Sequence, residues 1–177
     1  MDLKTKVHSL LSENLDNSSV VIDATLGRGR DTLFLAKNIS VKKIFAFDIQ
    51  SQAIEESKKL FVNANVIDKI FLYNECHSKI DSFVKEKINA AIFNLGYLPS
   101  SDKKVTTNAK TTLESLQKCV ELADEKFCFC VTCYRGHEGG EEEFKEVKDF
   151  FIKNLNEYRV FGDENNLKSP ILFFYRK

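Results

Sequence analysis

A turn that contains two glycines connects the first apolar run of the chain to a helical pattern. The run covers residues 20–22, and Gly27 and Gly29 follow it closely. A second apolar run, residues 44–47, ends in Asp48. Glycine lets the backbone approach a ligand, and a carboxylate at the end of the neighbouring strand accepts hydrogen bonds from ribose hydroxyls. The pairing predicts an α/β sheet that binds an adenosine-containing cofactor.

The remaining chain alternates between short apolar runs and helical patterns. The expected strands cover residues 19–24, 43–48, 69–73, 89–94 and 126–133, and the expected helices cover 4–15, 31–35, 53–61, 107–122 and the segment after Gly140. This alternation is typical of a parallel sheet with helices on both faces. Two further runs, 158–161 and 171–175, are joined by a polar connector without a helix, which predicts an antiparallel hairpin. A mostly parallel seven-stranded sheet that ends in such a hairpin resembles the class I fold of S-adenosylmethionine (SAM)-dependent methyltransferases.

Composition limits the functions that the chain can have. The 177 residues, 43% of them hydrophobic and 29% charged, predict one globular domain over 1–177 with an N-terminal helix. A formal net charge of +0 excludes a strongly basic coat, so any RNA contact must be a local patch. No apolar stretch approaches the roughly 18 residues of a membrane span, and no secretory signal opens the chain. Five cysteines at irregular spacing favour reduced thiols. We therefore expect a cytoplasmic monomer or homodimer.

The glycine turn favours SAM over a dinucleotide. A dinucleotide loop reads G-x-G-x-x-G, but Thr32 stands where its third glycine would be. Asp23, an acidic residue in the preceding strand, also fits a SAM loop. A nicotinamide-dependent oxidoreductase remains the alternative, and so does a tight turn that binds nothing. Asp48, for its part, either binds the ribose or caps the helix that begins at Ser51.

The segment after the fourth strand suggests an amine as the methyl acceptor. Residues 94–97 read Asn-Leu-Gly-Tyr and follow a strand at the edge where a parallel sheet opens its ligand crevice. Amine methyltransferases of this class often carry an Asp/Asn-Pro-Pro-Tyr/Phe turn there. The Asn94 amide oxygen and the Leu95 carbonyl would accept the hydrogens of the amine, and the Tyr97 ring would stack on the substrate. The alternative is a β–α loop that uses glycine for conformation alone.

Three histidine or acidic side chains are candidates to receive the amine proton. They are Asp102, His77 and His137. His77 follows the third strand, so we interpret it first as lining of the cofactor pocket together with Glu75 and Cys76. His137 follows the fifth strand, and histidine is the usual side chain for proton transfer near neutral pH. Its alternative role is that of a loop histidine that holds backbone groups.

Basic and aromatic side chains near the proposed crevice could bind RNA. Lys103, Lys104 and Lys110 lie beyond the Asn94 turn, and Arg135 lies across the crevice. They would pair with phosphates while Tyr97 or Tyr134 stacks on a base. A solvated lysine surface is the alternative explanation.

The cysteines at 128, 130 and 133 have a spacing that could suggest zinc. They lie in an apolar run without the turns that gather ligands around a metal. Cys128 and Cys130 would share one face of a strand as small core residues. We therefore predict no metal site.

Several of these segments together resemble the MnmM/YtqB-like methyltransferases, formerly described as rRNA methylases. The resemblance runs from about Val20 to the end, and it is carried by residues 23–32, 47–50, 93–99, 102–103, 106–107, 111 and 134–140. It implies SAM-dependent methylation of the amine of 5-aminomethyl(-2-thio)uridine at the wobble position of the tRNA anticodon stem-loop. Arg28 and Arg30 depart from the usual Gly-Asn-Gly-His-Asp-Thr loop, and Ser100 and Ser101 replace a common Gly-Gly pair. Alternatives are rRNA or a small amine as substrate, or a module that has lost turnover.

Residues are assigned to roles as follows. The catalytic candidates are Asn94, Tyr97, Asp102 and His137. The cofactor-binding candidates are Asp23, Thr25, Gly27, Gly29, Asp31, Thr32, Asp48, Gln50, Glu75, Cys76, His77 and Asn94. The RNA-binding candidates are Tyr97, Lys103, Lys104, Lys110, Tyr134 and Arg135.

Overall fold

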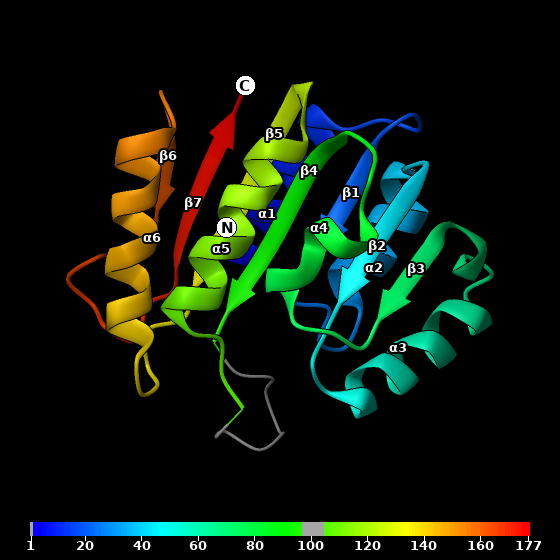
Figure 1. The fold of residues 1–177 in the computed structure, drawn as a ribbon, viewed down its shortest axis with the longest axis horizontal. Helices are drawn as coiled ribbons and strands as arrows, with labels where there is room; N and C mark the ends of the chain where they lie inside the picture. Colours follow the sequence, from blue (N-terminus) through cyan, green and yellow to red (C-terminus); the bar gives the residue numbers. More distant parts are fainter. Residues whose placement is uncertain (1, 97–104) are drawn as a thin grey trace.

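The sheet of this protein is mixed and places the carboxyl ends of five parallel strands along one edge (Figure 1). The computed structural model describes residues 2–96 and 105–177. Within them, seven strands pair in the order β3-β2-β1-β4-β5-β7-β6. The strands are β1 (Val20–Asp23), β2 (Lys43–Phe47), β3 (Ile70–Tyr73), β4 (Ile88–Leu95), β5 (Ala123–Cys133), β6 (Arg159–Phe161) and β7 (Ile171–Arg176). Strand β7 runs antiparallel to both β5 and β6.

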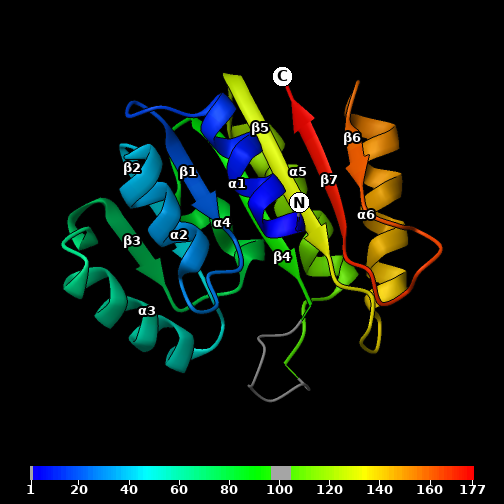
Figure 2. The same cartoon turned by 180° about the vertical axis from the view of Figure 1, so that it is seen from behind.

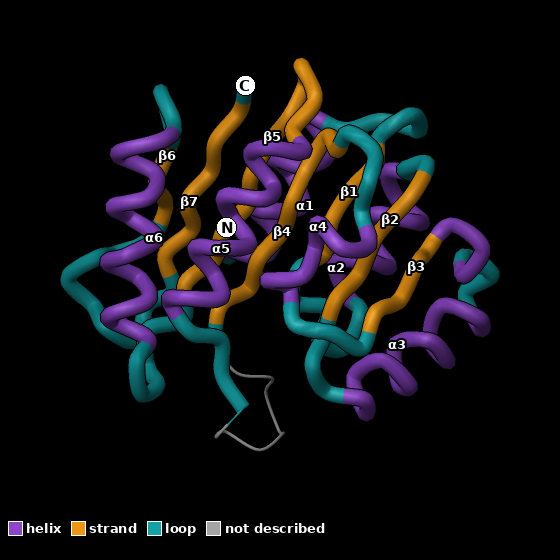
Figure 3. Tube along the Cα trace, in the orientation of Figure 1, coloured by secondary structure: helices purple, strands orange, loops and turns teal. Residues whose placement is uncertain are grey.

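Helices cover both faces of the sheet, as Figures 2 and 3 show. They are α1 (Leu3–Asn14), α2 (Arg30–Phe34), α3 (Ser51–Asn63), α4 (Ile80–Phe83), α5 (Ala109–Leu122) and α6 (Gly140–Asn154). A π-helical turn, Leu35–Ile39, continues α2, and short 3-10 turns cover Ile67–Lys69 and His77–Lys79. In the described part of the chain, no helix combines the length and apolar character that crossing a membrane requires.

Each face of the sheet has its own apolar cluster. On one face, Leu10 and Leu11 of α1 and Phe61 of α3 are fully buried against β1, β2 and β4. On the other, side chains of α4, α5 and α6 pack against the same strands. Phe151 of α6 lies at the centre of that second cluster, with ring centroids 5.1 Å from Phe173 and 6.2 Å from Phe129. Because both faces are covered, the central strands are apolar on both sides.

The predicted fold class is confirmed, including the antiparallel hairpin at the end of the sheet. One local expectation is wrong, because helix α5 begins at Ala109 rather than at residue 107. Its N-cap is Asn108, whose side chain accepts a hydrogen bond from Thr111 N. Asp48 does not cap α3, whose N-cap position is Gln50.

The strand order sets the position of the ligand crevice. Strand β1 pairs in parallel with β2 on one side and with β4 on the other. The chain therefore leaves β1 toward one edge of the sheet and returns at β4 toward the opposite edge. In open α/β sheets, ligands bind outside the carboxyl ends of the strands at this switch point. The ends of β1 and β4 are where Asp23 and Asn94 lie.

The core position of Phe151 gives a test of the packing. Its side chain is 0% exposed, so Phe151→Ala should leave a cavity and lower the free energy of unfolding by about 3–5 kcal/mol. The next residue is a matched control: Ile152 is 58% exposed, and Ile152→Ala should change stability by no more than about 0.5 kcal/mol. Urea denaturation followed by circular dichroism measures both. Equal effects of the two substitutions would contradict this packing.

Candidate active site

A cleft of about 760 Å³ opens at the carboxyl ends of the parallel strands. This volume lies in the range of small-molecule sites. Residues at or after the ends of all five parallel strands line it, together with the start of α1 and the segment before α5. The predicted site residues among the lining are Thr25, Gly27, Asp31, Asp48, Gln50, Glu75, Cys76, His77, Asn94, Tyr134 and Arg135. The sheet thus gathers most of the predicted cofactor residues in one place.

The carboxylate of Asp48 joins the glycine loop to the end of β2. Its Oδ2 accepts a hydrogen bond from Gly27 N at 2.8 Å, and its Oδ1 accepts one from Gln50 N at 2.9 Å. Burial raises the pKa of Asp48, although these two hydrogen bonds act to lower it. The same carboxylate still lines the cleft. Asp48 is therefore a structural hydrogen-bond acceptor at a place where it can also meet a ligand.

Gly29 is required by both conformation and space. Its φ is +68°, in the left-handed region that favours glycine. A Cβ there would lie 2.6 Å from Phe61 Cζ and 2.9 Å from Ser57 Oγ of α3. The glycine loop therefore packs directly on α3.

Asp23 and Thr32 are buried behind the glycine loop and do not line the cleft. Thr32 Oγ1 donates a hydrogen bond to Asp23 Oδ2 at 2.6 Å. Gly29 is not among the residues that line the cleft either, so a direct contact of these three with the cofactor stays a prediction. Burial, together with the nearby charge of Asp31, raises the pKa of Asp23 to about 7.

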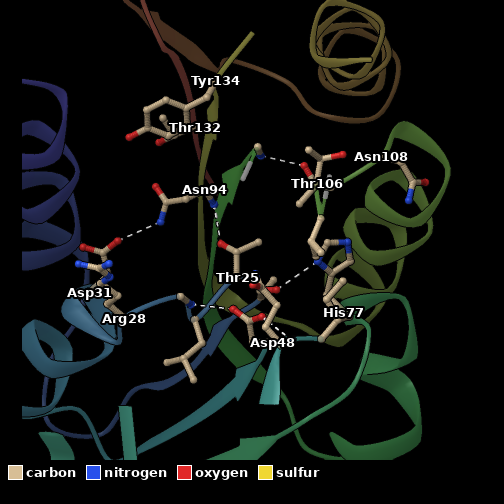
Figure 4. Close-up of a pocket in the computed structure, with 18 of the residues that line it drawn as sticks. Thr25, Arg28, Asp31, Asp48, His77, Asn94, Thr106, Asn108, Thr132 and Tyr134 are labelled. Atoms are coloured by element: carbon tan, nitrogen blue, oxygen red, sulfur yellow. Dashed lines mark hydrogen bonds between the residues drawn. The ribbon is translucent and has the colours of Figure 1, made fainter. Parts of the chain in front are cut away.

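Asn94 is held by contacts at both its backbone and its side chain. Its N–H donates to Thr25 Oγ1 at 2.7 Å, and its Nδ2 donates to Asp31 Oδ2 at 2.9 Å. In Figure 4 the amide nitrogen is turned to Asp31, while the carbonyl oxygen is turned toward the side of Thr132 and Tyr134. The Leu95 carbonyl, predicted as a second acceptor for an amine, accepts Tyr134 N instead. The amide oxygen of Asn94 is then the acceptor that this turn offers to the cleft.

His8 of α1 completes this contact and was missed by the sequence analysis. Its Nε2 lies 2.8 Å from Asp31 Oδ1, and its ring stacks on Phe34 at 3.8 Å between centroids. The only signal in the sequence is a polar ring at the edge of the apolar face of α1. Nothing in the sequence pairs it with Asp31. Ile49, a 54% exposed lining residue beside Asp48, was likewise not assigned a role.

The end of β3 supplies a buried histidine. His77 Nδ1 lies 3.1 Å from the Ala24 carbonyl, and burial lowers the pKa of His77, so the ring is neutral near pH 7. A neutral ring that donates from Nδ1 has an acceptor at Nε2. This Nε2 is buried and has no hydrogen-bond partner among the described residues, while His77 lines the cleft. An acceptor of this kind fits a ligand that carries an N–H or O–H donor. Beside it, Glu75 forms an ion pair with Lys79 at 2.7 Å, and Cys76 accepts a hydrogen bond from Ser78.

A buried carboxylate ties the Asn94 turn to α5 and α6. Thr107 donates its N–H to Gly96 O at 2.9 Å, and its hydroxyl accepts Gly96 N at 2.8 Å. Glu143 of α6 then accepts the hydroxyls of Thr107 and Thr112 at 2.7 and 2.6 Å. Burial raises the pKa of Glu143, although the hydrogen bonds from the two threonines act to lower it. The turn is thereby fixed relative to both helices.

Arg135 is a correction to the predicted RNA surface. Its side chain is only 2% exposed, and its guanidinium donates to the carbonyls of Asp163, Glu164 and Asn166. It also lies over the Phe144 ring at 4.8 Å. A guanidinium with these contacts anchors the β6–β7 connector, so we do not retain it as a phosphate ligand.

The other predicted residues lie in different places. Tyr134 lines the cleft and is 47% exposed, so its ring is accessible. His137 is not among the lining residues: its Nδ1 lies 2.9 Å from Glu138 O, and its ring approaches Gly140, which fits the alternative of a loop histidine. Lys110 is exposed on the first turn of α5 and lies outside the cleft. Tyr97, Asp102, Lys103 and Lys104 lie outside the described residues.

The cysteines of β5 belong to the core. Cys128, Cys130 and Cys133 are buried, and burial raises the pKa of the Cys128 thiol to about 12. Thiols of this kind stay protonated, whereas a metal ligand is a thiolate. Over residues 2–96 and 105–177, no group of three or more His, Cys, Asp or Glu side chains could hold a metal ion.

The buried Asp23 predicts a stability that depends on pH. Its pKa of about 7 in the folded state exceeds the ordinary value, so the folded state binds more protons than the unfolded state between about pH 4 and pH 7. The contribution of this group to stability should therefore fall as pH rises through that window, by at most about 4 kcal/mol. Asp23→Asn should flatten this dependence, which denaturant unfolding at pH 5, 6, 7 and 8 measures. An unchanged pH profile would show that Asp23 is ionised throughout.

Comparison with known proteins places this chain in a family. A family model described as "Putative rRNA methylase" matches residues 44–169. A chloroplastic tRNA (mnm(5)s(2)U34)-methyltransferase of Arabidopsis thaliana is 33% identical over 154 residues, which are 81% of this chain and 56% of that protein. The chain thus spans little more than half the length of this relative.

Solved structures agree over the whole fold. An rRNA-methylase structure from Clostridium thermocellum has a TM-score of 0.90 at 30% identity and covers 100% of this chain and 98% of its own. A Streptococcus mutans methyltransferase in complex with SAH has a TM-score of 0.85 at 32% identity, and the match covers 100% of this chain and 99% of that one. The chain therefore belongs to the rRNA methylase family, and by fold and family it is a SAM-dependent methyltransferase.

Proposed function

We propose that this protein transfers the methyl group of SAM to the primary amine of 5-aminomethyl(-2-thio)uridine at the wobble position of a tRNA. The product is the 5-methylaminomethyl nucleoside. The observation that carries the proposal is the Asn94 amide, whose nitrogen is bound to Asp31 and whose oxygen remains for an amine. The tRNA methyltransferase among the relatives supports this choice of substrate.

The cofactor would lie along the ends of β1, β2 and β3. SAM supplies an electrophilic methyl group on a sulfonium. The backbone of Gly27, the side chain of Thr25 and the carboxylates of Asp31 and Asp48 would hold it from one side. Gly29 would act by shaping the loop that carries Gly27. The buried Nε2 of His77 would accept a hydrogen bond from it, with Gln50, Glu75 and Cys76 around it. Ile49 offers an apolar surface for a flat ring.

The chain's own residues would prepare the amine. A primary amine is mostly protonated in neutral water, and only its free lone pair attacks a methyl carbon. Asn94 Oδ1 would accept an amine hydrogen and thereby aim the lone pair. Alignment of this kind contributes up to about 7–11 kcal/mol in favourable cases. Tyr97 as a stacking residue and Asp102 or His137 as the proton acceptor remain proposals.

Charge at the cleft supports an RNA substrate. Among the described residues that line it, four exposed side chains are cationic: Lys4, Arg28, Arg30 and Lys168. Since the net charge of the chain is +0, this concentration of cations is local. It would pair with phosphates around one nucleotide, while the accessible Tyr134 ring would stack on a base. Lys103, Lys104 and Lys110 remain proposed phosphate contacts.

The family description favours rRNA as a second candidate substrate. One experiment separates the two. Purified protein and SAM are incubated with anticodon stem-loops that carry 5-aminomethyluridine, with unmodified stem-loops and with total rRNA, and nucleosides are analysed by mass spectrometry. Methyl transfer only to the aminomethyl stem-loop supports the proposal, and transfer only to rRNA rejects it. Calorimetry with SAM and with NAD tests the cofactor separately.

Asn94→Ala should lower kcat on the order of 10²-fold, because the amine loses its aligning acceptor. The dissociation constant of SAM should change much less. Asn89 on the same strand is the control: its side chain contacts Val20 N and Lys126 O at the opposite end of β4. Asn89→Ala should lower stability and leave kcat near the wild-type value. Steady-state kinetics with the aminomethyl stem-loop measures both. Equal loss of kcat in the two variants would contradict a role for Asn94.

Gly29→Ala should weaken SAM binding at least about tenfold. The substitution strains a positive φ and forces the loop away from Phe61. Gly136 lines the same cleft, but a Cβ there meets no atom within 4 Å. Gly136→Ala should therefore bind SAM like the wild type. Isothermal titration calorimetry compares them, and equal affinities of the two variants would show that the loop tolerates a side chain.

A further inference from the structure

A chain of hydrogen bonds leads from the N-terminal helix to the amide that faces the cleft. Its members are His8 of α1, Asp31 of α2 and Asn94 of β4. We propose that His8 is a positioning residue that acts through Asp31 to keep the carbonyl oxygen of Asn94 turned toward the substrate amine. The inference rests on the proposed function, since it deepens the role of Asn94.

The contacts fix each member of the chain in turn. His8 Nε2 lies 2.8 Å from Asp31 Oδ1, and Asn94 Nδ2 donates to Asp31 Oδ2 at 2.9 Å. Both oxygens of one carboxylate are therefore engaged, each by a different element of the fold. The His8 and Asp31 side chains are 19% and 18% exposed, so water competes little for these bonds. Two engaged oxygens leave the carboxylate little freedom to rotate.

The orientation of the His8 ring is also determined. It stacks on Phe34 with an interplanar angle of 7° and a centroid distance of 3.8 Å. Helix α1 is itself anchored, because Val7, Leu10 and Leu11 are buried against the sheet. A ring held in this way presents one nitrogen to Asp31 in a fixed direction.

The amide of Asn94 can present either of its ends, and only one suits an amine acceptor. The oxygen accepts hydrogens, whereas the NH₂ group donates them and would repel an amine. An ionised carboxylate only accepts hydrogen bonds, so Asp31 selects the NH₂ end and leaves the oxygen for the cleft. A protonated Asp31 could instead donate to the amide oxygen and favour the opposite orientation. The charge of Asp31 thus decides which end of the amide the substrate meets.

The surroundings of Asp31 favour its charged form. Burial works against the charge, but the hydrogen bonds from His8 and Asn94 and the nearby Lys4 outweigh it and lower the pKa of Asp31. The charge of Asp31 also raises the pKa values of Asp23, Cys130 and Tyr134. Asp23 lies at the end of β1, Cys130 lies in β5, and Tyr134 follows β5. Arg30 is adjacent in the chain. Loss of His8 removes the second-largest influence on this carboxyl and raises its pKa.

Two substitutions separate the hydrogen bond from the packing. His8→Phe keeps a ring on Phe34 and removes the bond to Asp31, whereas His8→Gln retains an N–H donor. Ser12→Ala, at an exposed position of the same helix, is the control. We expect His8→Phe to lower kcat for the aminomethyl stem-loop about tenfold with little change in KM. In the pH profile of kcat, the acid limb of the His8→Phe variant should move to higher pH. His8→Gln should recover most of the activity, and Ser12→Ala should equal the wild type.

A structural readout keeps the inference independent of activity. Crystal structures of the wild type and His8→Phe with SAH are compared, and the orientation of the Asn94 amide is assigned from its hydrogen-bond partners. A reoriented or disordered amide in His8→Phe supports the inference. Unchanged kcat and pH profile, or an unchanged amide, overturns it, as does equal loss of activity in the Phe and Gln variants. If the wild type itself fails to methylate the stem-loop, the proposed function falls, and the two crystal structures alone decide the role of His8.

Discussion

The hydrogen bond between Asn94 and Asp31 joins two segments that lie 63 positions apart in the chain. It forms because β1 and β4 pair in parallel, so their carboxyl ends arrive at the same edge of the sheet. The glycine loop then turns back over that edge and carries Asp31 to the end of β4. Every feature of the site depends on this arrangement: the cleft lies where the two strand ends meet, and the amide that faces it is oriented by a residue of the loop.

Two aspartates in this small region, Asp23 and Asp31, have pKa values that are shifted in opposite directions. Asp23 lies beneath the loop, and burial next to Asp31 raises its pKa to about 7. Asp31 has two hydrogen-bond donors, and they hold its pKa below the ordinary value. The environments push the two pKa values apart, so one group tends to hold a proton while its neighbour keeps its charge. This difference in protonation lowers the electrostatic repulsion between the side chains of Asp23 and Asp31.

The local part of this site could be predicted from the sequence. Apolar runs and the glycines between them predict the strands that lead to Gly27 and Asp48 and the strand that contains Asn94. These signals depend on neighbouring residues alone. The direction of a side chain depends on packing between distant segments, and a local pattern does not contain it. Arg135 lines the crevice as expected, but its guanidinium donates to carbonyls of the β6–β7 connector. Asp23 is acidic and close to the loop, yet its side chain is buried and accepts a hydrogen bond from Thr32.

His8 shows that a local sequence pattern can also miss a residue of the site. In the sequence it is a polar residue beside the apolar face of a helix, with no motif around it. Its partner Asp31 lies 23 positions away, and only the packing of α1 on the sheet brings them together. The segment that matches the family model begins at residue 44, so neither member of this pair lies within it.

The first 43 residues therefore contribute more to the cleft than the glycine loop alone. Lys4 lines the cleft from α1, and Arg28 and Arg30 line it from the loop. Because these cations belong to the same segments as His8 and Asp31, electrostatic attraction of a phosphate backbone and orientation of the Asn94 amide would use one structural unit.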